Sequence, residues 1–177
     1  MRRSAPRVVL GCDVGTSFGW AVLRRGDTLL RSGDAVHRVG SGRWRLPGGG
    51  SERGKMDRLV HLRTHLDDLI ERAQVEVVAY EKVEHHVSTW SAQVYGELVG
   101  VLRLACADAD LPPPVGLGVG AVKKRLTGRG NAKKDLMVAS ARPILGRDPV
   151  SDDEADALGV ALAWLDQPPP EPLPRGR

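Results

Sequence analysis

Residues 8–23 read Val-Val-Leu-Gly-Cys-Asp-Val-Gly-Thr-Ser-Phe-Gly-Trp-Ala-Val-Leu. An apolar run at 8–12 ends at Asp13, and a second apolar run covers 18–23 after Gly15. Two such runs separated by a glycine-containing turn predict a strand, a turn and a second strand. Because the first run shows no polar alternation, we expect a central strand covered on both faces. Its end presents the Asp13 carboxylate, which suits a metal ligand, although an aspartate beside a glycine can also simply close a tight hairpin.

The segment Asp-Val-Gly-Thr at 13–16 resembles two known patterns. One is the phosphate loop of the actin-like and sugar-kinase ATPases, and the other is the first metal-binding acid of the ribonuclease H-like nucleases. The chain has 177 residues, 41% of them hydrophobic, which is enough for one substantial core and predicts a single domain. Actin-like ATPases need two lobes of this kind. The length therefore favours the nuclease pattern.

The overall composition limits the class of protein. The net charge is +4 and the isoelectric point is about 9.4, which permits a polyanionic partner without requiring one. Cys12 and Cys106 show neither a disulfide framework nor a zinc-binding spacing, so we expect both to be core residues. No apolar run is long enough to cross a membrane, and the N-terminal sequence does not fit a signal peptide. We therefore expect a cytoplasmic protein.

A second carboxylate ends another apolar run. Residues 75–81, Val-Glu-Val-Val-Ala-Tyr-Glu, predict a buried strand that ends at Glu81. Before it, residues 27–36 predict a third strand, and apolar residues at helical spacing predict an amphipathic helix over 56–73. Two inner strands that each end in a lone acid indicate more than a chance hairpin.

Residues 38–55 are rich in glycine and arginine and show no periodicity, so they predict a loop. The loop is either a solvated surface segment or a mobile arm that contacts nucleic acid. In the second case Arg43 and Arg45 would meet phosphates, and Trp44 would stack on a base.

A second helix is predicted from Ser88 to Ala109. One of its faces is apolar, and Tyr95, Val99 and Cys106 extend the apolar surface around the side. A helix that is apolar over more than one face needs more than one neighbour. Deep burial in the same domain and a subunit interface explain the surplus equally well.

The stretch 123–134 carries six cations in twelve residues. They are Lys123, Lys124, Arg125, Arg129, Lys133 and Lys134. They flank Gly-Arg-Gly-Asn at 128–131, which predicts a turn before the start of a helix. Backbone N–H groups at such a helix start bind phosphate together with the side-chain charges. The alternative is an ordinary solvated charged face.

The last helix is predicted to begin at Asp152, with Ser151 as its N-cap in a capping-box pattern. Acids in a first turn usually complement the helix dipole and need no further role. Asp156 lies beyond the first turn, and it shares a face with Asp153 because the two are three residues apart. The proline-rich segment 167–177 predicts a disordered or extended tail.

The order of these motifs along residues 8–166 resembles the RuvC family of Holliday junction resolvases, in a phage-type or divergent branch. The shared features are a strand ending in Asp-x-Gly, a strand ending in Glu, the basic segment with Gly-x-Gly, and Asp-x-x-Asp-Ala-Leu in the last helix. The resemblance implies an α/β, ribonuclease H-like fold, a mixed five-stranded sheet flanked by helices, in one domain over 1–166. It also implies a homodimer paired through the helix after Glu81. The interface residues that we expect are Tyr95, Val99, Leu102 and Cys106.

The same resemblance implies the residues of an active site. The acids that would bind divalent metal are Asp13, Glu81, Asp153 and Asp156. The lysines that would lie near the scissile phosphate are Lys123 and Lys134. Three of these assignments have an alternative one position away. They are Asp152 in place of Asp153, Lys124 in place of Lys123 and Lys133 in place of Lys134.

Phosphodiester hydrolysis needs an activated water and charge neutralisation on the phosphate, and Mg²⁺ or Mn²⁺ held by carboxylates supplies both. Two ions bridged by Asp13 would hold the attacking and leaving oxygens in line. We therefore expect an endonuclease that resolves Holliday junctions or other branched DNA by paired symmetric nicks, leaving 5′-phosphate and 3′-hydroxyl ends. The alternatives are an actin-like ATP-binding module and a non-catalytic nucleic-acid-binding relative.

One position departs from the family pattern. Bacterial members have an aromatic residue three positions after the second acid, which stacks on a base at the crossover. This chain has Glu84 there, and the nearest aromatic residue is Trp90. The cleavage-sequence preference therefore stays open, as does a branch-migration partner.

Overall fold

Strands and helices follow one another along the parts of the chain that the computed structural model describes, residues 8–29, 35–148 and 150–167. In chain order they are β1 (Val8–Asp13), β2 (Ser17–Leu29), β3 (Ala35–Arg45), α1 (Glu52–Ala73), β4 (Val77–Lys82), α2 (Thr89–Asp108), β5 (Val115–Gly118), α3 (Val119–Thr127), α4 (Lys134–Leu145) and α5 (Asp152–Leu165). Most of the tail predicted at 167–177 lies outside the described residues. Among the described helices, none is both long and apolar enough to cross a membrane.

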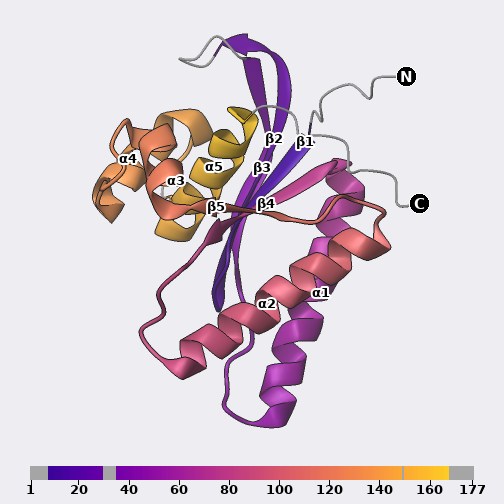
Figure 1. Ribbon diagram of the computed structural model, residues 1–177. Helices are drawn as coiled ribbons and strands as arrows, with labels where there is room; N and C mark the ends of the chain where they lie inside the picture. The colour runs from indigo at the N-terminus through magenta and orange to yellow at the C-terminus, as the bar shows by residue number, and fades with distance from the viewer. Residues whose placement is uncertain (1–7, 30–34, 149, 168–177) are drawn as a thin grey trace, which may run out of the picture.

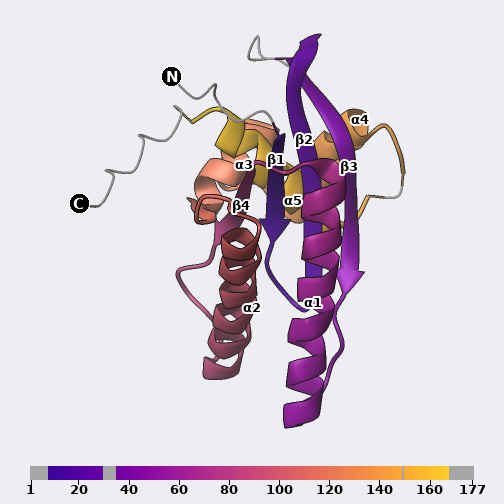
Figure 2. The ribbon, with the colours of Figure 1, turned by 90° about the vertical axis from the view of Figure 1, so that its right-hand side faces the viewer.

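The strands form one mixed sheet in the order β3-β2-β1-β4-β5. β1 pairs antiparallel with β2 and parallel with β4, while β3 and β5 occupy the two edges. Helices α1 and α2 lie on one face of the sheet, and α3, α4 and α5 lie on the other (Figures 1 and 2). This architecture confirms the predicted mixed five-stranded sheet flanked by helices.

β1 is the central strand and is buried on both faces, as its apolar run predicts. Leu10 and Cys12 belong to the core under α1 and α2, whereas Val9 belongs to the core under α5. Cys12 and Cys106 are buried free thiols, as expected. Asp13, the last residue of the strand, is the only one of its six that is partly exposed.

Helix α5 contacts the sheet through its own backbone. A Cβ at Gly11 would lie 2.4 Å from the carbonyl oxygen of Ala157, and one at Gly19 would lie 2.0 Å from the carbonyl oxygen of Asp153. Both distances are too short for any side chain, so these glycines allow the helix to lie directly on β1 and β2. Because Gly19 pairs with Asp13 in the β1–β2 ladder, the contact brings the first turn of α5 next to the end of β1.

The predicted boundaries around β2 and β3 are wrong. The end of β2 and the start of β3 replace the single strand expected over 27–36. β3 then continues to Arg45, so most of the predicted loop at 38–55 is strand or, from Glu52, helix α1. Two of the glycines that suggested a loop, Gly40 and Gly42, lie under a tryptophan of β2, since a Cβ at Gly42 would lie 2.8 Å from the ring of Trp20.

Trp44 is a packing residue rather than part of a mobile arm. Its ring stacks on Phe18 at a centroid distance of 5.6 Å and on His65 of α1 at 4.9 Å, and it also meets Trp20 at 5.6 Å. The prediction that Trp44 stacks on a base is therefore wrong, because its ring is already packed within the chain.

The surplus apolar surface of α2 is buried within the chain. Val99, Leu102 and Cys106 are at most 3% exposed and belong to the core between α1, α2 and the sheet. Tyr95 is half-buried, and its hydroxyl donates to the carbonyl oxygen of Glu81 at 3.0 Å. The expected subunit interface is wrong for Val99, Leu102 and Cys106, because α2 uses these apolar side chains to pack in the core between α1 and the sheet.

Candidate active site

Acids from β1, β4 and α5 converge at one end of the sheet. β1 and β4 are parallel neighbours, and the pairing of Cys12 with Tyr80 brings the next residues, Asp13 and Glu81, side by side. Asp156 approaches them from α5, and among the neighbouring acids it has the largest effect on Asp13. The structure therefore brings together three of the four acids that the sequence singles out.

Burial and mutual repulsion raise the pKa values of these carboxyl groups. Burial, followed by the charges of Asp156 and Glu81, raises the pKa of Asp13 to about 8. Burial and then Asp156 raise the pKa of Glu81 to about 7. Burial raises the pKa of Asp156 to about 6, although Lys123 and Lys134 oppose the rise. Three carboxyl groups whose charged forms are disfavoured by burial and by neighbouring acids make a site that a cation would stabilise.

One of these oxygens lacks a partner. Within the described part of the chain, Oε2 of Glu81 is buried and has no hydrogen-bond partner. A buried carboxylate oxygen without a partner is costly. Hard divalent cations such as Mg²⁺ and Mn²⁺ prefer carboxylate ligands. The donor set of Asp13, Glu81 and Asp156 therefore fits such an ion.

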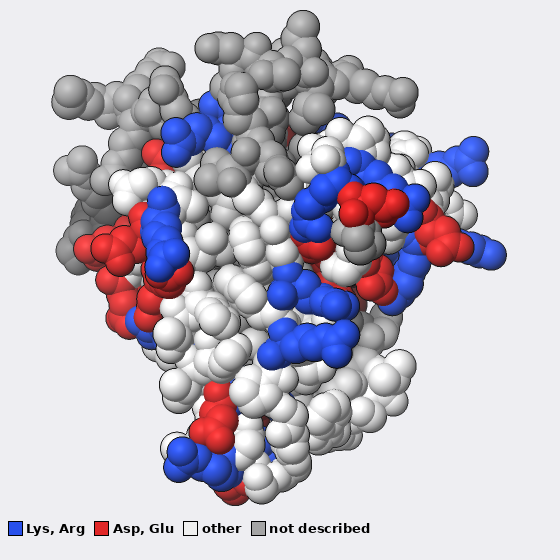
Figure 3. Space-filling view, turned by 180° about the vertical axis from the view of Figure 1, so that it is seen from behind, with Lys and Arg blue, Asp and Glu red and all other residues white. Residues whose placement is uncertain are grey.

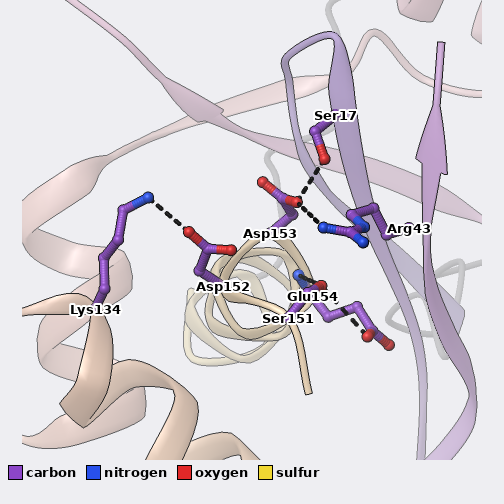
Figure 4. A network of polar contacts seen from close by, with 7 residues as sticks. All are labelled: Ser17, Arg43, Lys134, Ser151, Asp152, Asp153 and Glu154. Carbon is purple, nitrogen blue, oxygen red and sulfur yellow. Dashed lines mark hydrogen bonds and ion pairs between the residues drawn. The ribbon is translucent and has the colours of Figure 1, made fainter. Parts of the chain in front are cut away.

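The acids do not form a closed set of ligands around one point. Among the residues that the structure describes, no three of Asp, Glu, His and Cys are arranged as ligands of one metal. Asp153, the fourth predicted ligand, is directed toward β2 and β3 (Figure 4). Its Oδ2 accepts a hydrogen bond from Oγ of Ser17 at 2.6 Å and lies 3.6 Å from Nη1 of Arg43. Its charge still contributes to the raised pKa of Asp13.

Asp152, the alternative to Asp153, is directed toward α4 (Figure 4). Its Oδ2 accepts a hydrogen bond from Nζ of Lys134 at 2.6 Å, and this contact lowers the pKa of Asp152. Each of the two neighbouring carboxylates thus has its own cationic partner.

The two predicted lysines lie at this site. Lys123 is close enough to two of the acids to lower the pKa of both. Lys134 is held at the start of α4 by its ion pair with the first turn of α5. Their neighbours Lys124 and Lys133 are exposed. Of the four lysines in this stretch, Lys123 and Lys134 are the two whose charges act on the carboxyl group of Asp156.

The other predicted DNA-binding cations are more widely spread. Arg43 and Arg45 lie on β3, where Arg43 contacts the start of α5. Arg129 is exposed in the turn before α4. Arg125 forms an ion pair with Asp166, just beyond the far end of α5, so the structure does not bring it to the acids. On the face shown in Figure 3, basic and acidic side chains are intermingled, so DNA binding depends on the positions of individual cations.

Three residues that shape the site were not predicted from the sequence. Ser17 binds Asp153, Gly19 allows α5 to approach the sheet, and Tyr95 binds the backbone at the end of β4. Ser17 and its partner are 136 positions apart. Only the packing of α5 on β2 brings them together, so the local sequence carries no signal for the contact.

Comparison with known proteins shows the family to which the chain belongs. The family model described as "Crossover junction endodeoxyribonuclease RuvC" matches residues 9–164. The chain belongs to the RuvC family. The RuvC of Anaeromyxobacter sp. (strain K) is 36% identical over 162 residues, which cover 89% of this chain and 80% of that protein. The RuvC of Chloroflexus aggregans (strain MD-66 / DSM 9485) is 34% identical over 160 residues, which cover 86% and 89%.

Solved structures agree with this family. The Thermus thermophilus RuvC in complex with Holliday junction substrate has a TM-score of 0.73 at 25% identity, covering 89% of this chain and 92% of that one. The yeast mitochondrial Holliday junction resolvase Ydc2 has a TM-score of 0.61 at 16% identity, covering 93% and 80%, and supports the fold alone. The RuvC family comprises metal-dependent nucleases with a ribonuclease H-like fold. These findings confirm the predicted family, fold and enzyme class, and they do not favour the ATP-binding alternative.

Proposed function

We propose that this RuvC-family chain resolves four-way DNA junctions by hydrolysing one phosphodiester in each of two opposed strands, leaving 5′-phosphate and 3′-hydroxyl ends. The observation that carries the proposal is the convergence of Asp13, Glu81 and Asp156 beside Lys123. Clustered carboxylates suit metal-dependent hydrolysis, and a lysine beside them suits a phosphate substrate. The relative from Thermus thermophilus was solved with a Holliday junction substrate, which supports the same class of DNA.

Asp13, Glu81 and Asp156 would hold the metal, with a first-turn acid of α5 as a further ligand. The ion is Mg²⁺ or Mn²⁺, with two ions in each site. Bound there, such ions supply nucleophile activation and neutralise charge on the phosphate. The protein contributes rigidity, because Asp13 and Glu81 end two paired strands and Tyr95 binds the backbone carbonyl of Glu81.

Lys123 and Lys134 hold the scissile phosphate. Lys123 already lies beside the acids, and the side chain of Lys134 is 78% exposed, so a phosphate can reach its ammonium group without breaking any core contact. The cations that contact further phosphates of the junction are Arg43, Arg45, Lys124, Arg129 and Lys133. Arg125 is excluded because its charge is used in an ion pair at the far end of α5.

The enzyme works as a homodimer. A four-way junction must be cut at symmetric positions in two strands, and a twofold dimer provides two equivalent sites. Because the other sides of α2 are buried within the chain, only its exposed side can take part in the dimer interface. Trp90 and Leu104 are 53% and 58% exposed, and a Cβ at Gly96 or Gly100 would meet nothing within 4 Å in the described chain. Residues 1–166 form the nuclease unit, with the tail outside it.

The test is cleavage of a four-way junction compared with a linear duplex of the same sequence, with and without Mg²⁺. We expect paired symmetric nicks in the junction only, and only with the metal. Asp13→Asn removes a metal ligand and one negative charge near the DNA, so cleavage should fall by at least about 10²–10³-fold while junction affinity is kept or improves. Asp57→Asn, the same chemical change at an exposed position of α1, is the control. Equal cutting of linear duplex, or substantial activity in Asp13→Asn, would exclude the proposal.

A further inference from the structure

Asp153 occupies an unusual position among the acids. Its backbone lies directly on β2, because the carbonyl oxygen of Asp153 is only 2.0 Å from the position that a Cβ on Gly19 would occupy. The backbone is therefore fixed by this contact. Its side chain, which is 19% exposed, is directed toward Ser17 of β2 and Arg43 of β3 (Figure 4), although its charge still acts on Asp13 and Asp156. The freedom that remains is the choice of rotamer. A change of rotamer moves the carboxylate without moving the helix.

Two side chains determine the present rotamer. Ser17 donates its hydroxyl hydrogen to Oδ2 of Asp153 at 2.6 Å, a short distance typical of hydrogen bonds to charged oxygens. Arg43 adds a guanidinium group at 3.6 Å from the same oxygen. Both come from neighbouring strands, so they hold the carboxylate against the sheet from two directions.

Repulsion between carboxylates also favours the present position of the Asp153 side chain. Asp13 and Glu81 end two paired strands and Asp156 lies beside them, and a fourth carboxylate among these three would add to their mutual repulsion. Without a cation in the site, Asp153 is therefore more stable beside Arg43.

Arg43 also has access to DNA. Its side chain is 35% exposed, so it reaches solvent beside the proposed active site. A guanidinium group binds a phosphate through parallel hydrogen bonds and prefers it to a single distant carboxylate oxygen. An incoming phosphodiester would therefore compete with Asp153 for this side chain.

We propose, building on the function proposed above, that Ser17 and Arg43 are positioning residues that hold Asp153 outside the metal-ligand set until DNA draws Arg43 away. Asp153 then turns toward Asp13 and completes the ligand set. Metal binding and DNA binding are coupled as a result, and each strengthens the other by the same factor. The free enzyme binds metal weakly, which limits hydrolysis to sites where DNA is already in place.

The first experiment measures metal affinity of the free protein by calorimetry with Ca²⁺, which takes the same carboxylate ligands. Ser17→Ala removes one restraint on Asp153 without changing net charge, and Arg43→Gln removes the other. Each should bind Ca²⁺ about three to thirty times more tightly than the wild type, the range expected for loss of a hydrogen bond to a charged group that is partly screened. Ser17→Thr keeps the hydroxyl and should behave like the wild type. Arg45→Gln removes one positive charge from the same strand and should change the affinity much less.

The second experiment repeats the titration with a four-way junction present, and a denaturing gel of the same samples checks that the DNA stays intact. The junction should raise the Ca²⁺ affinity of the wild type several-fold more than that of Arg43→Gln, because the variant has already released Asp153. Ca²⁺ affinities of Ser17→Ala and Arg43→Gln equal to the wild type, with the same gain from DNA, would show that the contact only fastens α5 to the sheet. The comparison does not depend on cleavage, so failure of the junction assay and failure of this proposal are distinct results.

Discussion

The two faces of the sheet are packed in different ways. On the α5 face, Gly11 and Gly19 let the helix backbone touch the strands, and much of the helix surface is alanine. On the face of α1 and α2, large side chains fill the space, including Phe18 in its aromatic stack with Trp44. The acids lie on the first face or at its edge. The acids thus lie on or beside the α5 face of the sheet, where the helix backbone touches the strands and no side chain between them can change its rotamer to make room.

This difference has a physical consequence. Where backbone meets backbone, an added methyl group cannot be absorbed by a change of rotamer, so the helix must move. Where side chains interlock, neighbouring rotamers can share a change in volume at moderate cost. Substitutions on the α5 face should therefore act on the position of the acids. Substitutions on the other face should act on stability alone.

The largest effect is expected from Gly19→Ala. The new Cβ would lie 2.0 Å from the carbonyl oxygen of Asp153, so the start of α5 must shift. We expect cleavage of a four-way junction to fall about 100-fold, as for other displacements of about 1 Å, with a loss of about 1–3 kcal/mol in the free energy of unfolding. Junction cleavage rates and urea unfolding measure the two effects.

Gly48→Ala is the matched control for this substitution. Gly48 lies between β3 and α1, and a Cβ there would meet nothing within 4 Å. The new methyl group has room without any movement of the chain, so the free energy of unfolding should stay within about 0.5 kcal/mol of the wild type and the cleavage rate should be retained. Wild-type cleavage by Gly19→Ala would show that the α5 face does have room to adjust.

The next effect concerns the dependence of stability on pH in metal-free buffer. Burial and neighbouring acids raise the pKa of Asp13 from 3.8 to about 8, so between these values the folded state holds a proton that the unfolded state has lost. Stability should therefore fall as pH rises from about 4 to about 8. Asp13→Asn should flatten this profile and raise the free energy of unfolding at pH 8 by roughly 2–5 kcal/mol.

Urea unfolding at pH 5 and pH 8, with chelator, measures this effect. Added Mg²⁺ should restore the stability of the wild type at pH 8 far more than that of Asp13→Asn, because the ion replaces the missing proton. A wild-type profile that is flat from pH 5 to pH 8 would contradict the idea that the acids repel one another in the folded protein.

A smaller effect separates the lysines beside the acids from their neighbours. Lys123→Gln and Lys134→Gln remove charges that interact with the carboxylates, so each should lower the cleavage rate about 10- to 50-fold, as for loss of one hydrogen bond to a charged group. Lys124→Gln and Lys133→Gln, at exposed neighbouring positions, should lower junction affinity modestly and leave the cleavage rate at saturating DNA unchanged. Single-turnover rates at saturating enzyme distinguish the two pairs. Equal losses from all four would mean that the six-cation stretch acts only through its total charge.

The sequence predicted the parts of the site that local signals control. The apolar runs before Asp13 and Glu81 are long enough to identify buried strands, and Ser151 identifies the start of α5 because its side chain accepts from the third residue of the helix. Three of the acids could therefore be placed before the structure was known.

The parts that depend on packing could not be predicted. The glycines of β3 suggested a loop because nothing in the sequence shows that Trp20 covers them. From the sequence, the extra apolar surface of α2 could be covered by a partner subunit or by α1. The structure shows that α1 and the sheet cover it. The contact of Ser17 with Asp153 likewise exists only because α5 lies on β2.

The smallest effect is expected from Phe18→Leu, and it completes the comparison because Phe18 is the residue next to Gly19 on the same strand. Phe18 is fully buried on the opposite face, where it stacks on Trp44 at a centroid distance of 5.6 Å. Leucine loses the aromatic contact and some volume, which should cost about 1–2 kcal/mol of unfolding free energy, and neighbouring side chains can partly fill the space. The strand backbone does not need to move, so the position of α5 and the rate of junction cleavage at 25 °C should match the wild type. A loss of cleavage comparable to that of Gly19→Ala, in a protein still folded by circular dichroism, would mean that the two faces are mechanically coupled through β2 and that the division between them is wrong.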